Sequence, residues 1–161
     1  TMMWIKRITK GFLILVFFVT SSCGYKVLES LDSYNLNIKE IKSSGDKRIN
    51  FKIKNDLIFK SSQTNKINLI IDLQTTKEKK VKEKNIKNEI TKYKILANTY
   101  VKLSFYEKDL NDEFTVASSS DYLVGVNTIN NLQNERTAVE SVANELSKKI
   151  RTRVLLILND L

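Results

Sequence analysis

A two-residue alternation over residues 91–107 constrains the fold of this chain more than any other feature of the sequence. One side of the segment carries Tyr93, Ile95, Ala97, Thr99, Val101, Leu103 and Phe105, and the other side carries polar residues such as Lys94, Asn98 and Lys102. Successive side chains of a strand point to opposite faces, so this pattern predicts a long strand with one buried face. Such a strand has to lie in a sheet that other elements cover on one side.

The C-terminal segment carries a helical pattern. Its apolar stripe consists of Val139, Val142, Ala143, Leu146, Ile150, Val154, Ile157, Leu158 and Leu161. This spacing predicts a long helix that buries one face. We expect Asn130 to cap the helix, with Gln133 three residues later completing a capping box.

The remaining elements are shorter. Alternation predicts strands over 34–41 and 66–76, and over 113–126 with Phe114, Val116, Tyr122, Val124 and Val126 on one side. A helix is predicted over 47–60, because Asp46 can accept its first N–H groups and because Ile49, Ile53, Leu57 and Ile58 form a stripe. A hairpin turn is expected at 109–112.

This element order, β-α-β-β-β-α, predicts an α+β fold with two layers. The simplest assembly is a four-stranded mixed sheet with both helices packed on one face. The β-α-β start favours a parallel strand pair with a right-handed crossover, and the later strands should form antiparallel hairpins. The other face of the sheet should be polar.

Residues 1–22 have the features of a secretory signal peptide. Three basic residues precede the apolar run 11–19, which is too short to span a bilayer, and small residues follow it. Cys23, the one cysteine of the chain, comes next, so we expect it to be acylated and to anchor a single domain of residues 23–161 in outer-membrane lipid. Lipoprotein signals usually carry Leu where this chain has Thr20.

Few catalytic groups are available to this chain. It contains no histidine, and Cys23 is expected to be modified, which disfavours zinc sites, thiol nucleophiles and imidazole bases. Four glycines form no phosphate-binding loop. We therefore predict no catalytic residues, no metal site and no cofactor, and the one enzymatic alternative is a hydrolase built on two carboxylates.

Positive charge is concentrated between residues 77 and 94. The whole chain carries +9, and removing residues 1–22 with their three cations leaves +6. Segment 77–94 has eight lysines against three glutamates, which accounts for +5 of that charge. It is either a long loop or the outer half of a long hairpin. Lysine suits contact with phosphate, and our candidate residues for binding a phosphorylated lipid are Lys77, Lys79, Lys80, Lys82, Lys84 and Lys87. A solvated charged tip is the alternative.

The chain resembles the LPS-assembly lipoprotein family (LptE, also called RlpB) in three features: the sequence Cys23-Gly24-Tyr25, the element order, and a final helix entered from a strand that contains Tyr122. Members of this family are the plug subunit of the lipopolysaccharide translocon of the outer membrane. The resemblance implies a two-layer fold inside a large β-barrel partner, help in assembling that barrel, and contact with lipopolysaccharide. Residues 127–134 contain neither lysine nor arginine, so a basic residue that the family uses there would be missing.

These observations lead to one main expectation. The chain should be a non-catalytic outer-membrane lipoprotein, facing the periplasm or the barrel lumen, that plugs a lipopolysaccharide-inserting barrel and binds no nucleic acid. The alternative is an accessory lipoprotein that acts as an adaptor in another envelope complex.

Overall fold

The computed structural model describes residues 36–59, 67–106 and 110–160. The elements are β1 (Leu36–Gly45), α2 (Lys47–Phe59), β2 (Ile67–Lys84), β3 (Ile90–Phe105), β4 (Leu110–Leu123) and α3 (Thr128–Asn159). Their order is the predicted β-α-β-β-β-α. Cys23 and the signal segment lie outside the described residues, as does Leu161. Neither described helix is long and apolar enough to cross a membrane.

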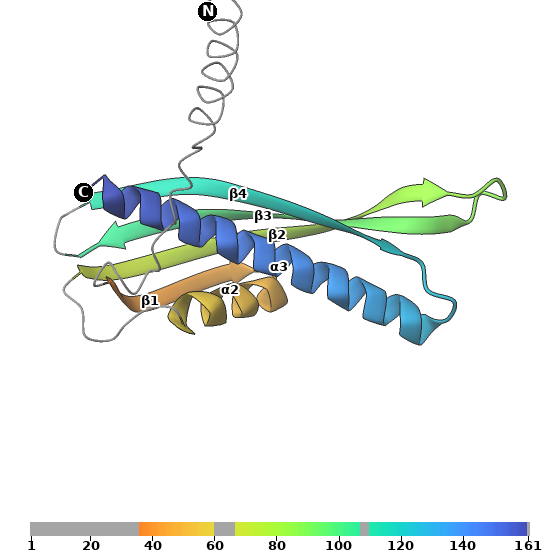
Figure 1. Ribbon diagram of the computed structural model, residues 1–161, viewed down its shortest axis with the longest axis horizontal. Helices are drawn as coiled ribbons and strands as arrows, with labels where there is room; N and C mark the ends of the chain where they lie inside the picture. The colour runs from red at the N-terminus through yellow and green to blue at the C-terminus, as the bar shows by residue number, and fades with distance from the viewer. Residues whose placement is uncertain (1–35, 60–66, 107–109, 161) are drawn as a thin grey trace, which may run out of the picture.

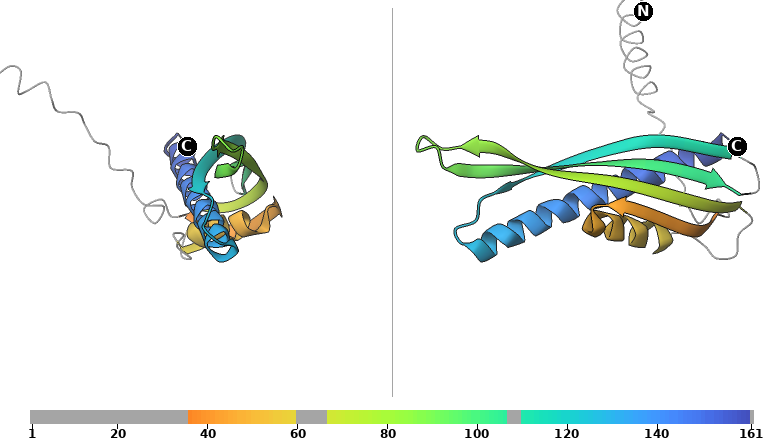
Figure 2. Two further views of the ribbon diagram at one scale, coloured as in Figure 1. Left: turned by 90° about the vertical axis from the view of Figure 1, so that its right-hand side faces the viewer. Right: turned by 180° about the vertical axis from the view of Figure 1, so that it is seen from behind.

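The four strands form one sheet in the order β1-β2-β3-β4. β1 and β2 are parallel, whereas β2–β3 and β3–β4 are antiparallel. The predicted mixed sheet is therefore confirmed. Both helices cover one face of the curved sheet, and α3 runs diagonally under β3 and β4 beside α2 (Figures 1 and 2).

The core lies between the sheet and the two helices. It contains Ile49, Ile53 and Leu57 of α2, the helix-facing side chains of the central strands, and the predicted stripe of α3 from Val139 to Leu158. Six side chains of the two central strands are at most 1% exposed: Leu69, Ile71 and Leu73 of β2, and Ile95, Val101 and Leu103 of β3. The long alternation thus buries one face, as expected. Ile58, which the sequence placed on the buried stripe of α2, is 53% exposed.

A β-bulge in β1 brings two isoleucines to the same face. Ile38 pairs with Leu69 and Glu40 with Ile70, so Lys39 is the extra residue. Residues three apart in a regular strand would point to opposite faces, but the bulge lets both Ile38 and Ile41 pack on the core. The strand continues to Gly45, whereas the sequence had predicted it to end at residue 41.

The two helices begin with side-chain caps. Asp46 Oδ1 accepts the N–H of Ile49 at 2.9 Å, as predicted. The cap predicted for α3 was wrong, because Asn127 rather than Asn130 accepts the first free amide, that of Asn130, at 2.8 Å. Asparagine is a good cap at either position, so residue type alone did not distinguish the two.

The hairpin between β2 and β3 is longer than its apolar pattern. β2 was predicted to end at residue 76, but it continues to Lys84, so segment 77–94 is the outer half of a long hairpin. β4 already pairs with β3 from Leu110, whereas the sequence had placed Leu110–Asp112 in the turn. β4 ends at Leu123, so Val124 and Val126 lie in the connection to α3 and not on the strand.

Candidate functional site

One end of the molecule has two prongs. The first, the hairpin prong, is the outer part of the β2–β3 hairpin (residues 77–94), and the second, the loop prong, is the β4–α3 connection with its flanking residues (123–132). Figure 1 shows the hairpin extending beyond β4 while α3 diverges from it. Segments far apart in the sequence therefore meet at this end, which we take as the candidate site.

The tip of the hairpin prong is held by a network around Asn85. Its Oδ1 accepts the N–H groups of Lys87 and Glu89 at 2.9 and 3.0 Å, and Asn88 has a φ of 63°. Asparagine tolerates this left-handed conformation better than most residues. The turn presents Ile86 fully exposed and leaves Lys84 and Lys87 at the surface.

Four of the six candidate lysines lie below the hairpin tip, and the structure divides them between the two faces of the sheet. Lys80 pairs across the sheet with Lys94, which alternates with the buried Ile95, so both lie on the face away from the helices. Lys80 forms a solvent-exposed ion pair with Glu78 at 2.8 Å, a kind of pair that contributes little energy. Lys82, outside the regular ladder, forms an ion pair with Asp121 of β4. This pair lowers the pKa of the Asp121 carboxyl below its ordinary value.

Lys77 and Lys79 point toward the helices instead. Lys77 contacts Asp46 at 2.7 Å, beside the start of α2. Burial alone would raise the pKa of Asp46, but the bonds from Lys77 and from the N–H of Ile49 outweigh it and lower the pKa. Lys77 therefore helps to hold the α2 N-terminus against β2.

Lys79 is the centre of a cluster that joins the base of the hairpin prong to α3. Its Nζ lies 2.6 Å from Oε2 of Glu135 and 4.4 Å from the ring centroid of Tyr93, which stacks on Tyr122. The Tyr122 hydroxyl donates to the same carboxylate at 2.9 Å. The bond from Lys79 lowers the pKa of Glu135. Cation–π contacts and ion pairs of this exposure each contribute about 0.5–1 kcal/mol, and together they join the base of the hairpin prong to α3.

The loop prong turns tightly onto α3 and carries exposed apolar side chains. A methyl group added to Gly125 would lie 2.3 Å from the backbone N of Asn131, so the close approach requires glycine here. Asn134 Nδ2 also donates to the carbonyl of Leu123 at 3.0 Å. Val126 is 98% exposed and Ile129 is 78% exposed.

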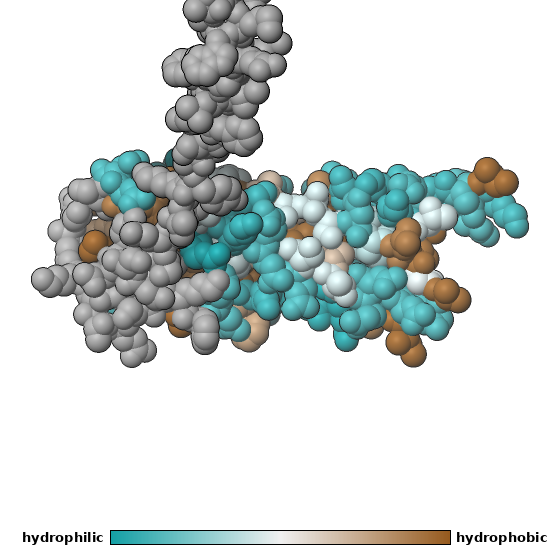
Figure 3. Space-filling view, in the orientation of Figure 1, coloured by the Kyte–Doolittle hydropathy of each residue, from teal (hydrophilic) through white to brown (hydrophobic). Residues whose placement is uncertain are grey.

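Exposed apolar side chains therefore occur on both prongs. They are Val81 and Ile86 on the hairpin prong, and Leu123, Val124, Val126, Ile129 and Leu132 on the loop prong. Figure 3 shows these patches at one end of the molecule, within a hydrophilic surface. The sequence reasoning identified the lysines but missed the loop prong, because it assigned two of its valines to a strand. The glycine inside the run Leu-Val-Gly-Val was the available signal.

The site combines cations with exposed apolar groups, which suits an amphiphile carrying an anionic group. No group of three or more acidic or cysteine residues in the described ranges could hold a metal ion. Glu140 and Glu145 line one groove beside α3. They are five residues apart, about 140° around the helix, and Glu140 forms an ion pair with Lys52 at 3.5 Å.

The fold matches known structures. No family model matches the chain, and the curated proteins contain no significant match. A protein assigned as a lipoprotein from Caulobacter crescentus CB15 has a TM-score of 0.53 at 10% identity, covering 81% of this chain and 96% of that chain. The solution structure of uncharacterized lipoprotein B from Nitrosomonas europaea has the same TM-score and identity, covering 84% and 93%.

A third structure, rare lipoprotein B from Shewanella oneidensis, has 14% identity and a TM-score of 0.46 over 76% of this chain and 95% of that chain. The two matches above a TM-score of 0.5 show that this chain has a fold found in proteins described as lipoproteins. The shared fold covers most of each chain.

Proposed function

We propose that this protein is a non-catalytic envelope lipoprotein whose two-pronged end binds lipopolysaccharide while its body plugs a β-barrel translocon in the outer membrane. Acylated Cys23 would anchor it in the membrane. The observation that carries the proposal is that exposed lysines and exposed apolar side chains gather at one end of the fold.

The two kinds of side chain match the two parts of such a lipid. Lys80, Lys84 and Lys87 are exposed, and none of them holds a helix in place, so they are available to phosphate groups. Ile86 and Val126 are almost fully exposed and could contact acyl chains. Moving such a side chain from water into contact with acyl chains would stabilise the complex by about 1.5–3 kcal/mol.

The internal contacts of the hairpin prong support a rigid contact surface. Lys79 and Glu135 fix the base of the prong against α3, and the Asn85 turn fixes its tip. A rigid surface loses less conformational entropy on binding than a flexible loop. The similarity to folds of lipoproteins and the Cys23 context support the envelope location.

The test compares two triple variants of the full chain in mild detergent. Lys80→Gln, Lys84→Gln and Lys87→Gln remove three charges from the hairpin prong. Lys42→Gln, Lys47→Gln and Lys102→Gln remove three exposed charges elsewhere and serve as the matched control. Each lysine near an anionic lipid surface contributes about 1 kcal/mol, so we expect the first variant to bind lipopolysaccharide roughly 100-fold more weakly at low salt.

This difference should shrink as salt rises, because the Debye length falls from about 30 Å at 0.01 M to about 8 Å at 0.15 M. Equal affinity of the two variants would contradict the lipid contact. Mass spectrometry of proteins that co-purify with both variants tests the plug role separately. A large β-barrel at equal stoichiometry supports it, whereas another envelope protein in its place favours an adaptor.

A further inference from the structure

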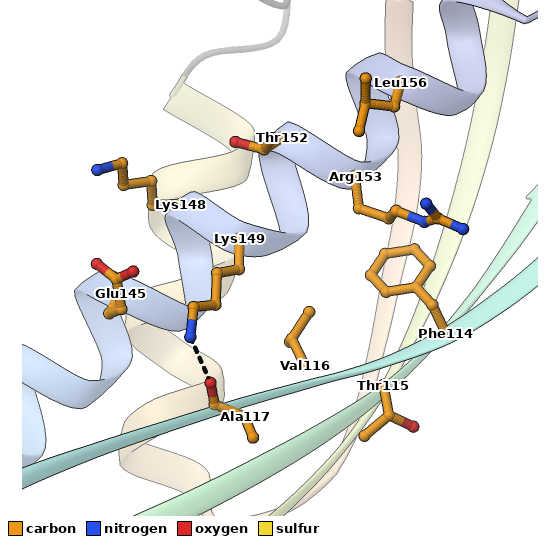
Figure 4. Close-up of a pocket in the computed structure, with 10 residues that line it drawn as sticks. All are labelled: Phe114, Thr115, Val116, Ala117, Glu145, Lys148, Lys149, Thr152, Arg153 and Leu156. Atoms are coloured by element: carbon orange, nitrogen blue, oxygen red, sulfur yellow. Dashed lines mark hydrogen bonds between the residues drawn. The ribbon is translucent and has the colours of Figure 1, made fainter.

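A groove runs between β4 and α3, away from the two-pronged end. One half has a volume of about 590 Å³ and an apolar surface formed by Phe114, Val116 and Leu156 (Figure 4). Lys149 and Arg153 line the α3 side of this half, and Cζ of Arg153 lies 6.0 Å from the ring centroid of Phe114. This half can accept an apolar side chain and an acidic one.

The groove continues along the same two elements with a different character. The adjoining half, about 550 Å³, is lined by small polar residues, among them Ser118 and Ser119 of β4 and Ser141 of α3. An acyl chain would leave these hydroxyl groups without partners, whereas a polypeptide carries polar groups along its whole length. The groove therefore fits an extended peptide better than a lipid chain.

The backbone of β4 supplies the remaining partner groups. β4 is an edge of the described sheet, and Lys149 Nζ donates to the carbonyl oxygen of Ala117 at 2.7 Å. This carbonyl therefore points away from β3. Backbone groups of residues two apart in a strand point the same way, so Thr115 and Ser119 also present their N–H and C=O groups at this edge.

We propose that an extended segment of another polypeptide binds in this groove as a fifth strand beside β4. Its backbone pairs with Thr115, Ala117 and Ser119, as in other cases of strand addition, and Lys149 exchanges the Ala117 carbonyl for the acidic side chain of the segment. An apolar side chain of the segment packs on Val116 and Leu156, and an acidic side chain lies between Lys149 and Arg153. This partner surface is separate from the lipid contact proposed above.

The test uses a phage-displayed library of random twelve-residue peptides, selected on the full chain in mild detergent. Enriched peptides are then labelled, and their affinities for three variants are measured by fluorescence anisotropy. Ala117→Pro removes one outward N–H, which an edge strand tolerates, and Ala117→Val keeps it. Lys149→Glu with Arg153→Glu reverses the charge of the groove, leaves the sequence of β4 unchanged and releases the Ala117 carbonyl from Lys149.

We expect enriched peptides to alternate apolar and polar residues and to contain an acid. Ala117→Pro should weaken their binding at least tenfold and Ala117→Val less than twofold, and the charge reversal should weaken it most at low salt. If Ala117→Pro destabilises the fold, the charge reversal decides.

Three results would overturn the proposal. The first is the absence of enriched peptides, or peptides that bind all variants equally. The second is a dimer in sedimentation that Ala117→Pro dissociates, which would assign the edge to a second copy of this chain. The third is binding of dodecanoate in the groove with no peptide enriched, which would assign it to an anionic acyl chain.

Discussion

Gly45 at the end of β1 should be the position least tolerant of a single added methyl group. Its φ is +88°, and a Cβ built there would lie 1.9 Å from the carbonyl oxygen of Thr75 in β2. The same carbonyl accepts the N–H of Asp46 at 2.9 Å, just before α2 begins. β1, β2 and α2 thus meet at a point where only glycine fits.

The cost of Gly45→Ala has two parts. An L-residue in the left-handed region costs about 1–2 kcal/mol. Relieving the overlap must also move β1 from β2, which breaks the Asp46–Thr75 bond and leaves an unpaired group at a cost of about 1–3 kcal/mol. We therefore expect the two parts together to lower the free energy of unfolding by about 2–5 kcal/mol.

Urea denaturation of the full chain, followed by circular dichroism, measures this loss. With a slope of about 1–3 kcal/mol/M, the midpoint should fall by at least about 0.7 M with the slope unchanged. Ser44→Ala, an exposed neighbour on the same strand, is the control and should change stability by no more than about 0.5 kcal/mol. A Gly45→Ala protein with the wild-type midpoint would refute the close approach of β1 to β2.

Two further predictions concern the core and the cluster at the base of the hairpin. Leu146→Ala removes a side chain that is 0% exposed and should lower the free energy of unfolding, measured by urea titration, by about 2–5 kcal/mol. Ile129→Ala, at a 78% exposed position, should lower it far less. Equal losses in the two variants would contradict the placement of α3. Because the folded pKa of Glu135 is lowered, chiefly by Lys79, its contribution to stability is present above the unfolded pKa of about 4.3 and is lost as the pH falls through the folded value. Glu135→Gln should therefore reduce the difference in the free energy of unfolding between pH 7 and pH 3. An unchanged difference would show that Glu135 and Lys79 do not form the ion pair.

Local pattern was sufficient to predict the element order and most of the core. The alternation around Val101 and the helical stripe around Leu146 each bury one face, because side-chain direction follows directly from the backbone period. Parallel pairing of β1 and β2 also followed from the sequence, since a helix lies between them. The basic character of the hairpin could be read from its lysines alone.

The ends of the elements and the partners of the charges depended on tertiary structure. β2 continues through a run of lysines with no apolar alternation, because β3 pairs with it there and because Lys79 reaches Glu135, 56 residues away. The sequence placed Val126 in a strand, whereas the packing of Gly125 against α3 directs it to solvent. Local periodicity records which face of a segment is apolar, but contacts between distant segments determine where a segment ends and which charges remain exposed.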